Sequence, residues 1–283
     1  MLKIHRLANI FGQFMLGRSP RFLALQRFPL LGTVLRGLSN LVLLPEQRVW
    51  IQLQKGAAEG LWLRLNPRTQ AGFYESERDL ALRELLRKHL RPGMVFYDLG
   101  ANLGLFALLA ARIVGPQGKV FAFEPEPELA PRISEHIEKN NCANVCLVPC
   151  AVWSTTGFVR FLRDKPSKSS DYGLGKVNVE SGARQSGSIA MVASVALDDF
   201  TEKEAPPDFI KCDVEGADVE VFEGAQNLLT KYKPLVECEV HSDQNATRLN
   251  EMFQDLGYVL DWYTRDHFFA APGTQEGRSQ ARR

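Results

Sequence analysis

The sequence lacks any apolar run long enough to cross a bilayer, and it has almost no net charge. No uninterrupted apolar stretch of about 18 residues or more occurs in the 283-residue chain, which argues against a membrane-spanning helix. The formal net charge is +1 at pH 7, so no global field attracts a polyanion such as nucleic acid. We therefore expect a cytoplasmic protein that does not bind nucleic acid.

Cysteine is also scarce. The five cysteines are odd in number and lie mostly in apolar runs, which favours buried thiols in a reducing compartment. Cys142, Cys146 and Cys150 are spaced by four, but the apolar residues around them predict a strand. Residues four apart on a strand are about 13 Å from one another, too far to share one zinc ion. We predict no metal site.

Acidic residues are absent from the first 45 positions, where six basic residues lie among Phe, Leu and Ile. Three interpretations stay open: a helical extension packed on the main domain, a basic amphipathic helix at a membrane surface, and an organelle presequence. After Pro45, alternating apolar residues predict a hairpin across 55–60. We place a helical and hairpin extension at 1–72, the main domain at 73–271 and a disordered tail at 272–283.

Strand and helix patterns alternate along the main domain after a helix that starts near Glu75 and ends before Arg91. Such alternation requires a parallel sheet. A hairpin after Gly257 would add antiparallel strands at the edge of that sheet. A strand at 158–162 and a mobile loop at 164–188 interrupt the alternation. The predicted fold is α/β, with a doubly wound, mostly parallel, seven-stranded sheet. Its strands are expected at 95–99, 119–123, 145–148, 209–212, 235–240, 258–263 and 267–271, with helices at 102–114, 126–140 and 217–229 and around 249–256.

The strongest local motif follows the first of these strands and opens a helix: Asp98-Leu99-Gly100-Ala101-Asn102-Leu103-Gly104. Small residues at the carboxyl end of such a strand let a ligand approach the backbone. The motif reads Gly-x-x-x-Gly rather than Gly-x-Gly-x-x-Gly, and Asp98 stands two residues before the first glycine. Because a carboxylate repels a pyrophosphate and attracts a cation, the turn predicts a positively charged nucleotide-type ligand.

A second acid, Glu124, follows Asp98 by 26 residues, at the end of the next strand. An acid at this place accepts hydrogen bonds from both ribose hydroxyls in dinucleotide-binding folds. The two acids together suit an adenosine that carries a charged amino-acid tail. S-adenosylmethionine fits this description, and NAD with its two phosphates fits it less well. The alternative is a tight turn and a solvated strand end without a ligand.

Two further strand ends carry polar groups. Asp213 is expected at the carboxyl edge of the sheet, beside the glycine turn, and Glu215 either lines the site or caps a helix. Glu237, Glu239 and His241 alternate with apolar residues, so they share one side of their strand. His241 is the best candidate for a general base, because imidazole can take a hydroxyl proton near neutral pH. A structural role for this histidine stays open.

These blocks together resemble the FkbM family of S-adenosylmethionine-dependent methyltransferases. The resemblance rests on Tyr97-Asp98-Leu99-Gly100-Ala101-Asn102-Leu103-Gly104, Ala122-Phe123-Glu124-Pro125, Leu197-Asp198-Asp199-Phe200 and Phe209-Ile210-Lys211-Cys212-Asp213-Val214-Glu215-Gly216-Ala217, with Phe73-Tyr74-Glu75 and Glu239 with His241 also similar. It implies a class I, Rossmann-like methyltransferase fold. It also implies that the donor is held by Asp98, Gly100, Asn102, Gly104, Glu124 and Glu75, and that the reaction site is lined by Asp213, Glu215, Glu239 and His241.

Members of this family commonly methylate hydroxyls of sugars, lipids or polyketide-type natural products, so the resemblance implies O-methylation of such an acceptor. Our hypothesis is that His241 removes the hydroxyl proton and that Asp213 orients the acceptor or the donor. A divalent metal on Asp213 and Glu215 is conceivable, but nothing in the spacing requires it. The alternatives are an NAD-dependent oxidoreductase and a non-catalytic module that binds S-adenosylmethionine.

Overall fold

The computed structural model describes residues 48–54, 56–66, 70, 77–164, 175–177 and 187–273. The chain falls into two compact units, of which one comprises 1–88 with 166–173 and the other 89–165 with 174–283. The first 47 residues, Glu75 and residues 274–283 lie outside the described residues. The predicted segment boundaries at 72 and 271 therefore remain a proposal.

The first unit contains the predicted hairpin. Strands β1 (Val49–Gln52) and β2 (Trp62–Leu65) pair antiparallel, with Val49 opposite Leu65. Their alternating apolar side chains are fully buried on one face, which is the pattern that a half-buried strand requires. The predicted helix near Glu75 is confirmed as α4 (Glu77–His89). Pro92 and then Gly93, at φ +88°, follow it, and proline cannot continue a helix because it has no N–H to donate.

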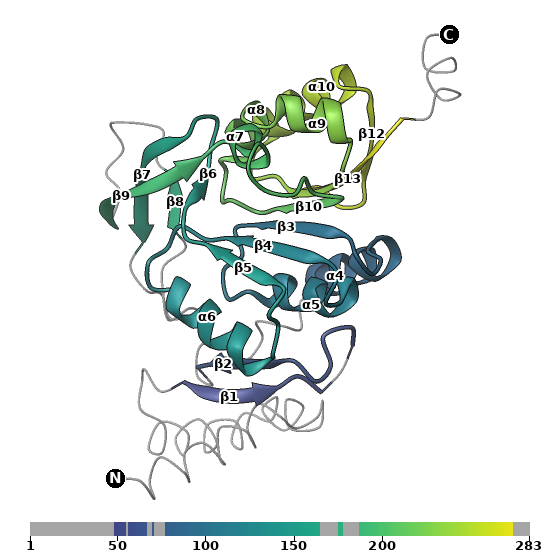
Figure 1. Cartoon of the computed structure of the whole chain (residues 1–283). Coiled ribbons are helices and arrows are strands. Elements are labelled where there is room, and N and C mark those ends of the chain that lie inside the picture. Colours follow the sequence, from purple (N-terminus) through teal and green to yellow (C-terminus); the bar gives the residue numbers. More distant parts are fainter. Residues whose placement is uncertain are drawn as a thin grey trace, which may run out of the picture. The chain divides into compact units, whose positions relative to one another are not determined.

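The second unit is built on the predicted seven-stranded sheet (Figure 1). Six strands run in one direction, and β13 runs against both of its neighbours. The hairpin after Gly257 is confirmed, but its antiparallel strand β13 is not the edge strand, because β12 lies outside it. In spatial order the strands are β12 (Tyr258–Trp262), β13 (His267–Pro272), β11 (Leu235–Glu239), β10 (Phe209–Cys212), β3 (Val95–Leu99), β4 (Lys119–Phe123) and β5 (Val145–Val148).

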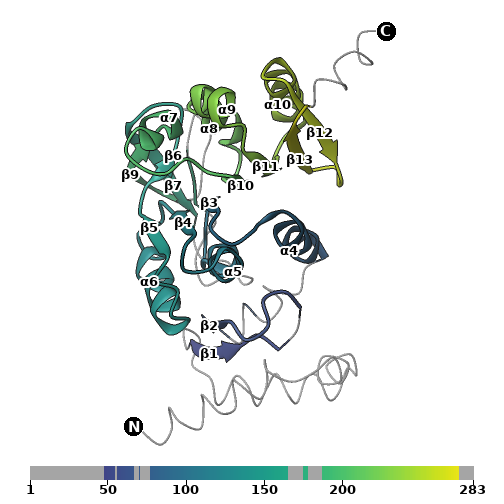
Figure 2. The same cartoon turned by 45° about the vertical axis from the view of Figure 1, so that its right-hand side comes forward.

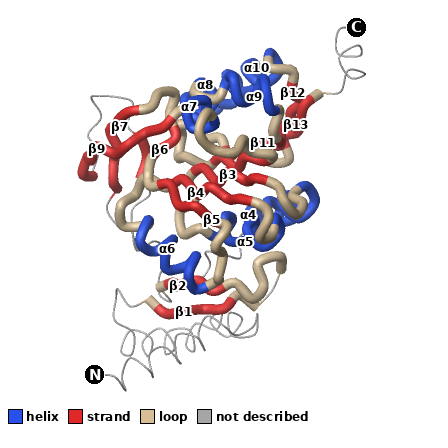
Figure 3. Tube along the Cα trace, in the orientation of Figure 1, coloured by secondary structure: helices blue, strands red, loops and turns tan. Residues whose placement is uncertain are grey.

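Helices cover both faces of this sheet (Figure 3). One face carries α5 (Leu105–Val114) and α6 (Ala130–Lys139), and the other carries α8 (Asp218–Glu223), α9 (Gln226–Tyr232) and α10 (Asp243–Asp255). Figure 2 shows α10 beside the β12–β13 hairpin, in agreement with the contacts between α10 and β12. This arrangement confirms the doubly wound fold and brings the carboxyl ends of β3, β4, β10 and β11 to one edge.

The single helix predicted at 217–229 is wrong, because α8 and α9 are separated at Gly224. A Cβ on Gly224 would lie 2.4 Å from the carbonyl oxygen of Trp153, so the chain passes this backbone closely there. Asp198, in the short helix α7 (Leu197–Thr201), then accepts hydrogen bonds from the amides of Asn227 and Leu228 at 3.0 and 2.8 Å. This carboxylate caps α9 from a distant part of the chain.

The loop predicted at 164–188 is partly wrong. A second sheet, in the order β6-β9-β7-β8, contains the predicted strand as β7 (Gly157–Asp164), together with β6 (Ala151–Val152), β8 (Gly175–Val177) and β9 (Gly187–Val195). Strand β8 lies in the middle of the predicted loop, while β7 and β9 include its first and its last residues. The apolar residues Ile189 and Met191 are about half exposed in β9, so the usual alternation of apolar and polar residues is missing. Residues 165–174 and 178–186 lie outside the described residues.

Aromatic rings hold the inner strands in place. Tyr97 and Phe123 pack edge-on or tilted against Phe200 of α7, with centroids 5.7 and 5.0 Å away, a geometry that aromatic pairs prefer. The Tyr97 hydroxyl also donates to the carbonyl of Ala205 at 2.7 Å. The ends of β3 and β4 therefore rest on a packed core. None of the helices in the part of the chain that the structure describes is long and apolar enough to span a membrane.

Candidate active site

The glycine turn after β3 is fixed by the protein's own backbone. Gly100 has φ +74°, and a Cβ there would lie 1.8 Å from the carbonyl oxygen of Asp213. The amides of Gly100 and Ala101 both donate to the carbonyl of Phe123, at 3.0 and 2.9 Å. The turn is thus pinned between the ends of β4 and β10. Glycine is required at position 100 because Asp213 occupies the space, which differs from the predicted reason of room for a ligand.

Two more residues of the turn have a left-handed backbone conformation. Asn102 has φ +53° and Gly104, which precedes α5, has φ +79°. A Cβ on Gly104 would lie 3.3 Å from Ile133, and the Gly104 amide donates to the carbonyl of Ala101 at 2.7 Å. Asparagine tolerates this conformation better than most residues. The sequence of the turn therefore matches its backbone at each of these positions.

Asp98 is buried and has a counterion that the sequence interpretation missed. The Asp98 side chain is fully buried, and the Lys211 ammonium lies 3.3 Å from its Oδ1. Lys211 also donates to the carbonyl oxygens of Gly100 and Leu99 at 2.9 and 3.4 Å. A lysine inside the apolar strand Phe209-Ile210-Lys211-Cys212 is the signal that could have revealed this pair, because a buried charge needs a partner.

The charges of this pair are set by burial and by each other. Burial raises the pKa of Asp98, and the neighbouring Lys211 opposes that shift. Burial lowers the pKa of Lys211, but Asp98 and Asp213 outweigh it, so the pKa is raised and the ammonium stays charged. The charge of Asp98 is therefore balanced inside the protein. It does not face a ligand as an unpaired carboxylate, as the sequence interpretation had assumed.

Glu124 joins the turn from the end of β4. Its Oε2 accepts a hydrogen bond from the Asn102 amide at 2.8 Å, and its Oε1 accepts one from the Glu126 amide at 2.9 Å. Burial is the main cause that raises the pKa of Glu124 to about 7. Each carboxylate oxygen has two lone pairs, so each can accept one more hydrogen bond. The predicted proximity of Glu124 to the turn is confirmed.

The four residues predicted for the reaction site also come together. His241 Nε2 lies 3.5 Å from Glu215 Oε2, 3.9 Å from Glu239 Oε1 and 4.0 Å from Asp213 Oδ1. These distances exceed those of hydrogen bonds. Between 21% and 34% of each of these side chains is exposed. We call Asp213, Glu215, Glu239 and His241 the reaction cluster.

Glu215 does not cap the helix that follows it. Helix α8 begins at Asp218, and no side chain caps its first turn in the described structure, so the capping alternative is wrong. Glu215 has φ +55°, which is unusual for a residue with a long side chain. Burial first, and then the charge of Asp213, raise the pKa of Glu215. The residue is held in a strained conformation with its carboxylate 3.5 Å from His241.

The β12–β13 hairpin supports β11 from behind this cluster. The buried Glu237 accepts hydrogen bonds from the Tyr263 hydroxyl at 2.7 Å and from His267 Nδ1 at 2.8 Å. Burial lowers the pKa of His267, but the contacts with Glu237 and Glu239 outweigh it and raise the pKa. Sequence reasoning missed both Tyr263 and His267, because neither follows a strand of the parallel core.

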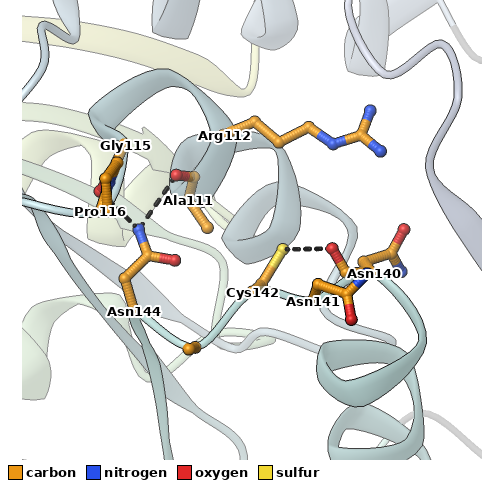
Figure 4. A pocket seen from close by; sticks show the side chains of 9 residues that line it. Ala111, Arg112, Gly115, Pro116, Asn140, Asn141, Cys142 and Asn144 are labelled. Atoms are coloured by element: carbon orange, nitrogen blue, oxygen red, sulfur yellow. Dashed lines mark hydrogen bonds between the residues drawn. The ribbon is translucent and has the colours of Figure 1, made fainter.

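A cavity of about 390 Å³ lies elsewhere, where α5 ends and β5 begins (Figure 4). In it, Asn144 Nδ2 donates to the carbonyls of Ala111 and Gly115 at 3.0 and 2.9 Å. Ligands in such folds bind at the carboxyl ends of the strands, so this cavity is not part of the site. Cys142 lines it with a buried thiol, whereas Cys146 is exposed, against the expectation of buried cysteines.

Comparisons with known proteins identify the family of this chain. Residues 98–260 match the family described as methyltransferase FkbM domain. Over 191 residues the chain is 30% identical to the hexuronic acid methyltransferase AglP of Haloferax volcanii, a match that covers 65% of this chain and 72% of AglP. The same family model includes the glycine turn, Glu124 and the whole reaction cluster.

Solved structures of methyltransferases are also similar. Precorrin-6y C5,15-methyltransferase from Geobacter metallireducens GS-15 has 14% identity and a TM-score of 0.45, covering 69% of this chain and 89% of that one. The FkbM methyltransferase from Methylobacillus flagellatus KT has 15% identity and a TM-score of 0.45, covering 73% and 55%. The FkbM match spans more than half of the chain, so this protein belongs to the FkbM methyltransferase family and uses S-adenosylmethionine as its methyl donor.

Proposed function

We propose that this enzyme methylates a hydroxyl group of a sugar, and that a uronic acid is the first acceptor to test. The relative AglP is a hexuronic acid methyltransferase. The observation that carries the proposal is the position of His241, with three carboxylates within 4.0 Å of its Nε2, beside the turn that we assign to the donor. Lipid and natural-product hydroxyls are the competing acceptors.

For the donor, we assign the adenosine to the glycine turn and its ribose hydroxyls to Glu124. Both Glu124 oxygens already accept backbone amides and retain capacity for two hydroxyl donors. Because Asp98 is paired with Lys211, recognition of the sulfonium and the ammonium falls mainly to the acids of the reaction cluster. Their partly exposed negative charges attract a cation. Glu75, which lies outside the described residues, stays a prediction for the same role.

For the chemistry, the acceptor oxygen attacks the methyl carbon, the carbon–sulfur bond breaks and S-adenosylhomocysteine leaves. Most of the acceleration comes from alignment of the oxygen with the methyl group and from exclusion of water. His241 Nε2 takes the hydroxyl proton as the new bond forms. The resulting imidazolium lies among Asp213, Glu215 and Glu239, which stabilise its charge, and Asp213 also orients the acceptor.

The test is methyl transfer from labelled S-adenosylmethionine to a panel of uronic acid glycosides, neutral glycosides and hydroxylated lipids. We expect transfer to the uronic acid compounds. In His241→Ala we expect kcat to fall about 10²- to 10⁴-fold, the usual contribution of a general base, while the Kd for the donor is unchanged. A matched control is Asp243→Ala, because that side chain is 91% exposed and has only a weak ion pair with Arg265.

Each outcome separates one part of the proposal from the rest. Full turnover in His241→Ala would show that another group is the base. Methyl transfer to lipids alone would mean that the acceptor is a lipid hydroxyl and not a sugar hydroxyl. Donor binding without transfer to any compound or cell extract would support the non-catalytic module instead. The basic N-terminal segment lies outside the described residues. Its three interpretations, as a domain extension, a membrane-surface helix or a presequence, therefore stay open.

A further inference from the structure

A second group of metal-type ligands lies behind the reaction cluster. One ligand atom each from Glu239, Asp266 and His267 lie within 4.8 Å of one another. Glu239 comes from the end of β11, whereas Asp266 and His267 come from the turn and the first residue of β13. The group therefore joins two strands that pair antiparallel, with Glu239 directly opposite His267.

The Nε2 atom of His267 is placed to bind an ion rather than to make a hydrogen bond. Only 8% of its side chain is exposed, and its Nε2 makes no hydrogen bond to any described residue. Nε2 lies 3.6 Å from Glu239 Oε2, which is too long for a hydrogen bond. It is close to the separation of about 3.4 Å that two ligand atoms have on a tetrahedral ion with bonds of about 2.1 Å.

The other ring nitrogen supports the same orientation. Nδ1 of His267 lies 2.8 Å from Glu237 Oε1, which also accepts the Tyr263 hydroxyl. A carboxylate acts only as an acceptor when ionised, so Nδ1 carries a proton, and Nε2, on the side of Glu239, is the ring nitrogen that is placed to bind an ion. A carboxylate that holds the far side of a histidine in this way is the usual arrangement behind metal-binding histidines.

We propose that Glu239, Asp266 and His267 bind a divalent transition-metal ion, for which Zn²⁺ is the best match. One imidazole nitrogen with two carboxylates is a donor set that Zn²⁺ accepts in a four-coordinate site, with water as the remaining ligand. The ion ties the end of β11 to the β12–β13 hairpin. It also fixes Glu239, whose other oxygen lies 3.9 Å from His241, and so orients one wall of the reaction cluster.

The experiment uses the full chain after treatment with a chelator. Titration with Zn²⁺ is followed by calorimetry and by the thermal unfolding temperature, and Co²⁺ serves as a spectroscopic probe. We expect one ion per chain, a saturable rise in Tm and the visible absorption of four-coordinate Co²⁺. These readouts do not involve methyl transfer, so this proposal can fail while the proposed function holds, and the reverse.

Two variants and one control locate the ion. His267→Gln and Asp266→Asn should each weaken Zn²⁺ binding by about tenfold or more. Asp266 is partly exposed in a turn, and its backbone carbonyl accepts the Val240 amide at 2.7 Å, so Asp266→Asn remains informative if His267→Gln fails to fold. Asp261→Asn, an exposed carboxylate on the neighbouring strand β12, should leave binding unchanged.

Two results would overturn the proposal. The absence of saturable binding would mean that Nε2 carries a proton and that Glu237, His267 and Glu239 form an ion-paired chain. The group Asp213, Glu239 and His241 also has one ligand atom each within 4.8 Å. If His241→Asn removed Zn²⁺ binding while Asp266→Asn did not, the ion would belong to that group and not to the one proposed.

Discussion

The donor turn and the reaction cluster lie at the same edge of the sheet but are built by different forces. In the turn, Asp98 and Lys211 are buried as a pair, and both oxygens of Glu124 accept backbone amides. In the cluster, His241 faces three carboxylates at 3.5 to 4.0 Å without a hydrogen bond to any of them. In the turn the charge of Asp98 is balanced by Lys211, whereas the cluster has excess negative charge that a cationic donor would offset.

Lys211 connects the two regions. Its ammonium is 2.9 Å from the Gly100 carbonyl in the turn and 3.8 Å from Asp213 Oδ2 in the cluster. The Lys211 ammonium thus offsets part of the negative charge on both sides. The comparison predicts that changes in the turn cost stability and donor binding together, and that changes in the cluster cost donor binding or chemistry and leave the fold intact.

The largest effect is expected from Gly100→Ala. The new methyl group would collide with the Asp213 carbonyl, 1.8 Å away, at a backbone with φ +74°, and neither backbone can yield without breaking its hydrogen bonds. We expect donor binding to fall below detection in calorimetry and the Tm to drop. The control is Gly115→Ala, which has φ +67° but open space around the site, so it should cost only the conformational penalty of about 1–3 kcal/mol. Equal losses in both variants would contradict the role given to the collision.

The next largest effect is expected from the buried ion pair. Lys211→Met leaves Asp98 as an unpaired buried charge, which costs about 3–5 kcal/mol in comparable cases. The double variant Asp98→Asn with Lys211→Met removes both charges and should recover at least half of that loss. Urea unfolding at pH 7 measures the free energies. If the losses of free energy of unfolding in the single variants Lys211→Met and Asp98→Asn simply add in the double variant, Asp98 and Lys211 do not act as a pair.

A smaller effect, which depends on pH, is expected at Glu124. Burial raises its pKa from the ordinary 4.5 to about 7, and only the ionised form accepts two ribose hydroxyls. Affinity for the donor should therefore rise with pH up to about 7 and then level off, with a slope of up to about tenfold per pH unit below that value. Glu124→Gln should bind more weakly and show a flat profile. An unchanged profile in this variant would place the ribose elsewhere.

The raised pKa of Glu124 also affects stability, and here a rise in pH has the opposite effect: it lowers the free energy of unfolding while it raises the affinity for the donor. A carboxyl whose pKa is raised on folding binds its proton more tightly in the native state than in the unfolded one. Between pH 4.5 and about pH 7 the native state thus binds more protons than the unfolded state, so the free energy of unfolding falls as pH rises through this range. Glu124→Gln should remove that decline when chemical unfolding is measured without donor.

The comparison also explains what the sequence could predict. Parallel strands end at one edge of the sheet, so Glu124, Asp213 and His241 could be brought together from strand order alone. A lysine inside an apolar strand signals that Lys211 needs a partner, but the identity of that partner, like those of His267, comes from neighbouring strands whose register no local pattern reveals. The break at Gly224 has the same cause, since the Trp153 backbone that requires it lies in a separate strand region. Local periodicity predicts elements, whereas close contacts between elements decide the pairing of charges and the ends of helices.

The smallest effect, and the sharpest test of the contrast, is expected at Glu215. This residue has φ +55° and its pKa is raised by burial and by Asp213, so it costs stability both through its backbone and through its charge. Glu215→Gly should relieve both and stabilise the protein by a few tenths to about 1 kcal/mol, while kcat falls because one carboxylate beside His241 is lost. Glu215→Gln keeps the strained backbone and removes the charge, so it separates the two contributions.

Asn141→Gly, at φ +54° away from the site, should change stability less and leave kcat unaltered, because asparagine tolerates that conformation. A loss of stability in Glu215→Gly would mean that the acids of the cluster hold the fold together, and the division between a structural turn and a chemical cluster would be wrong.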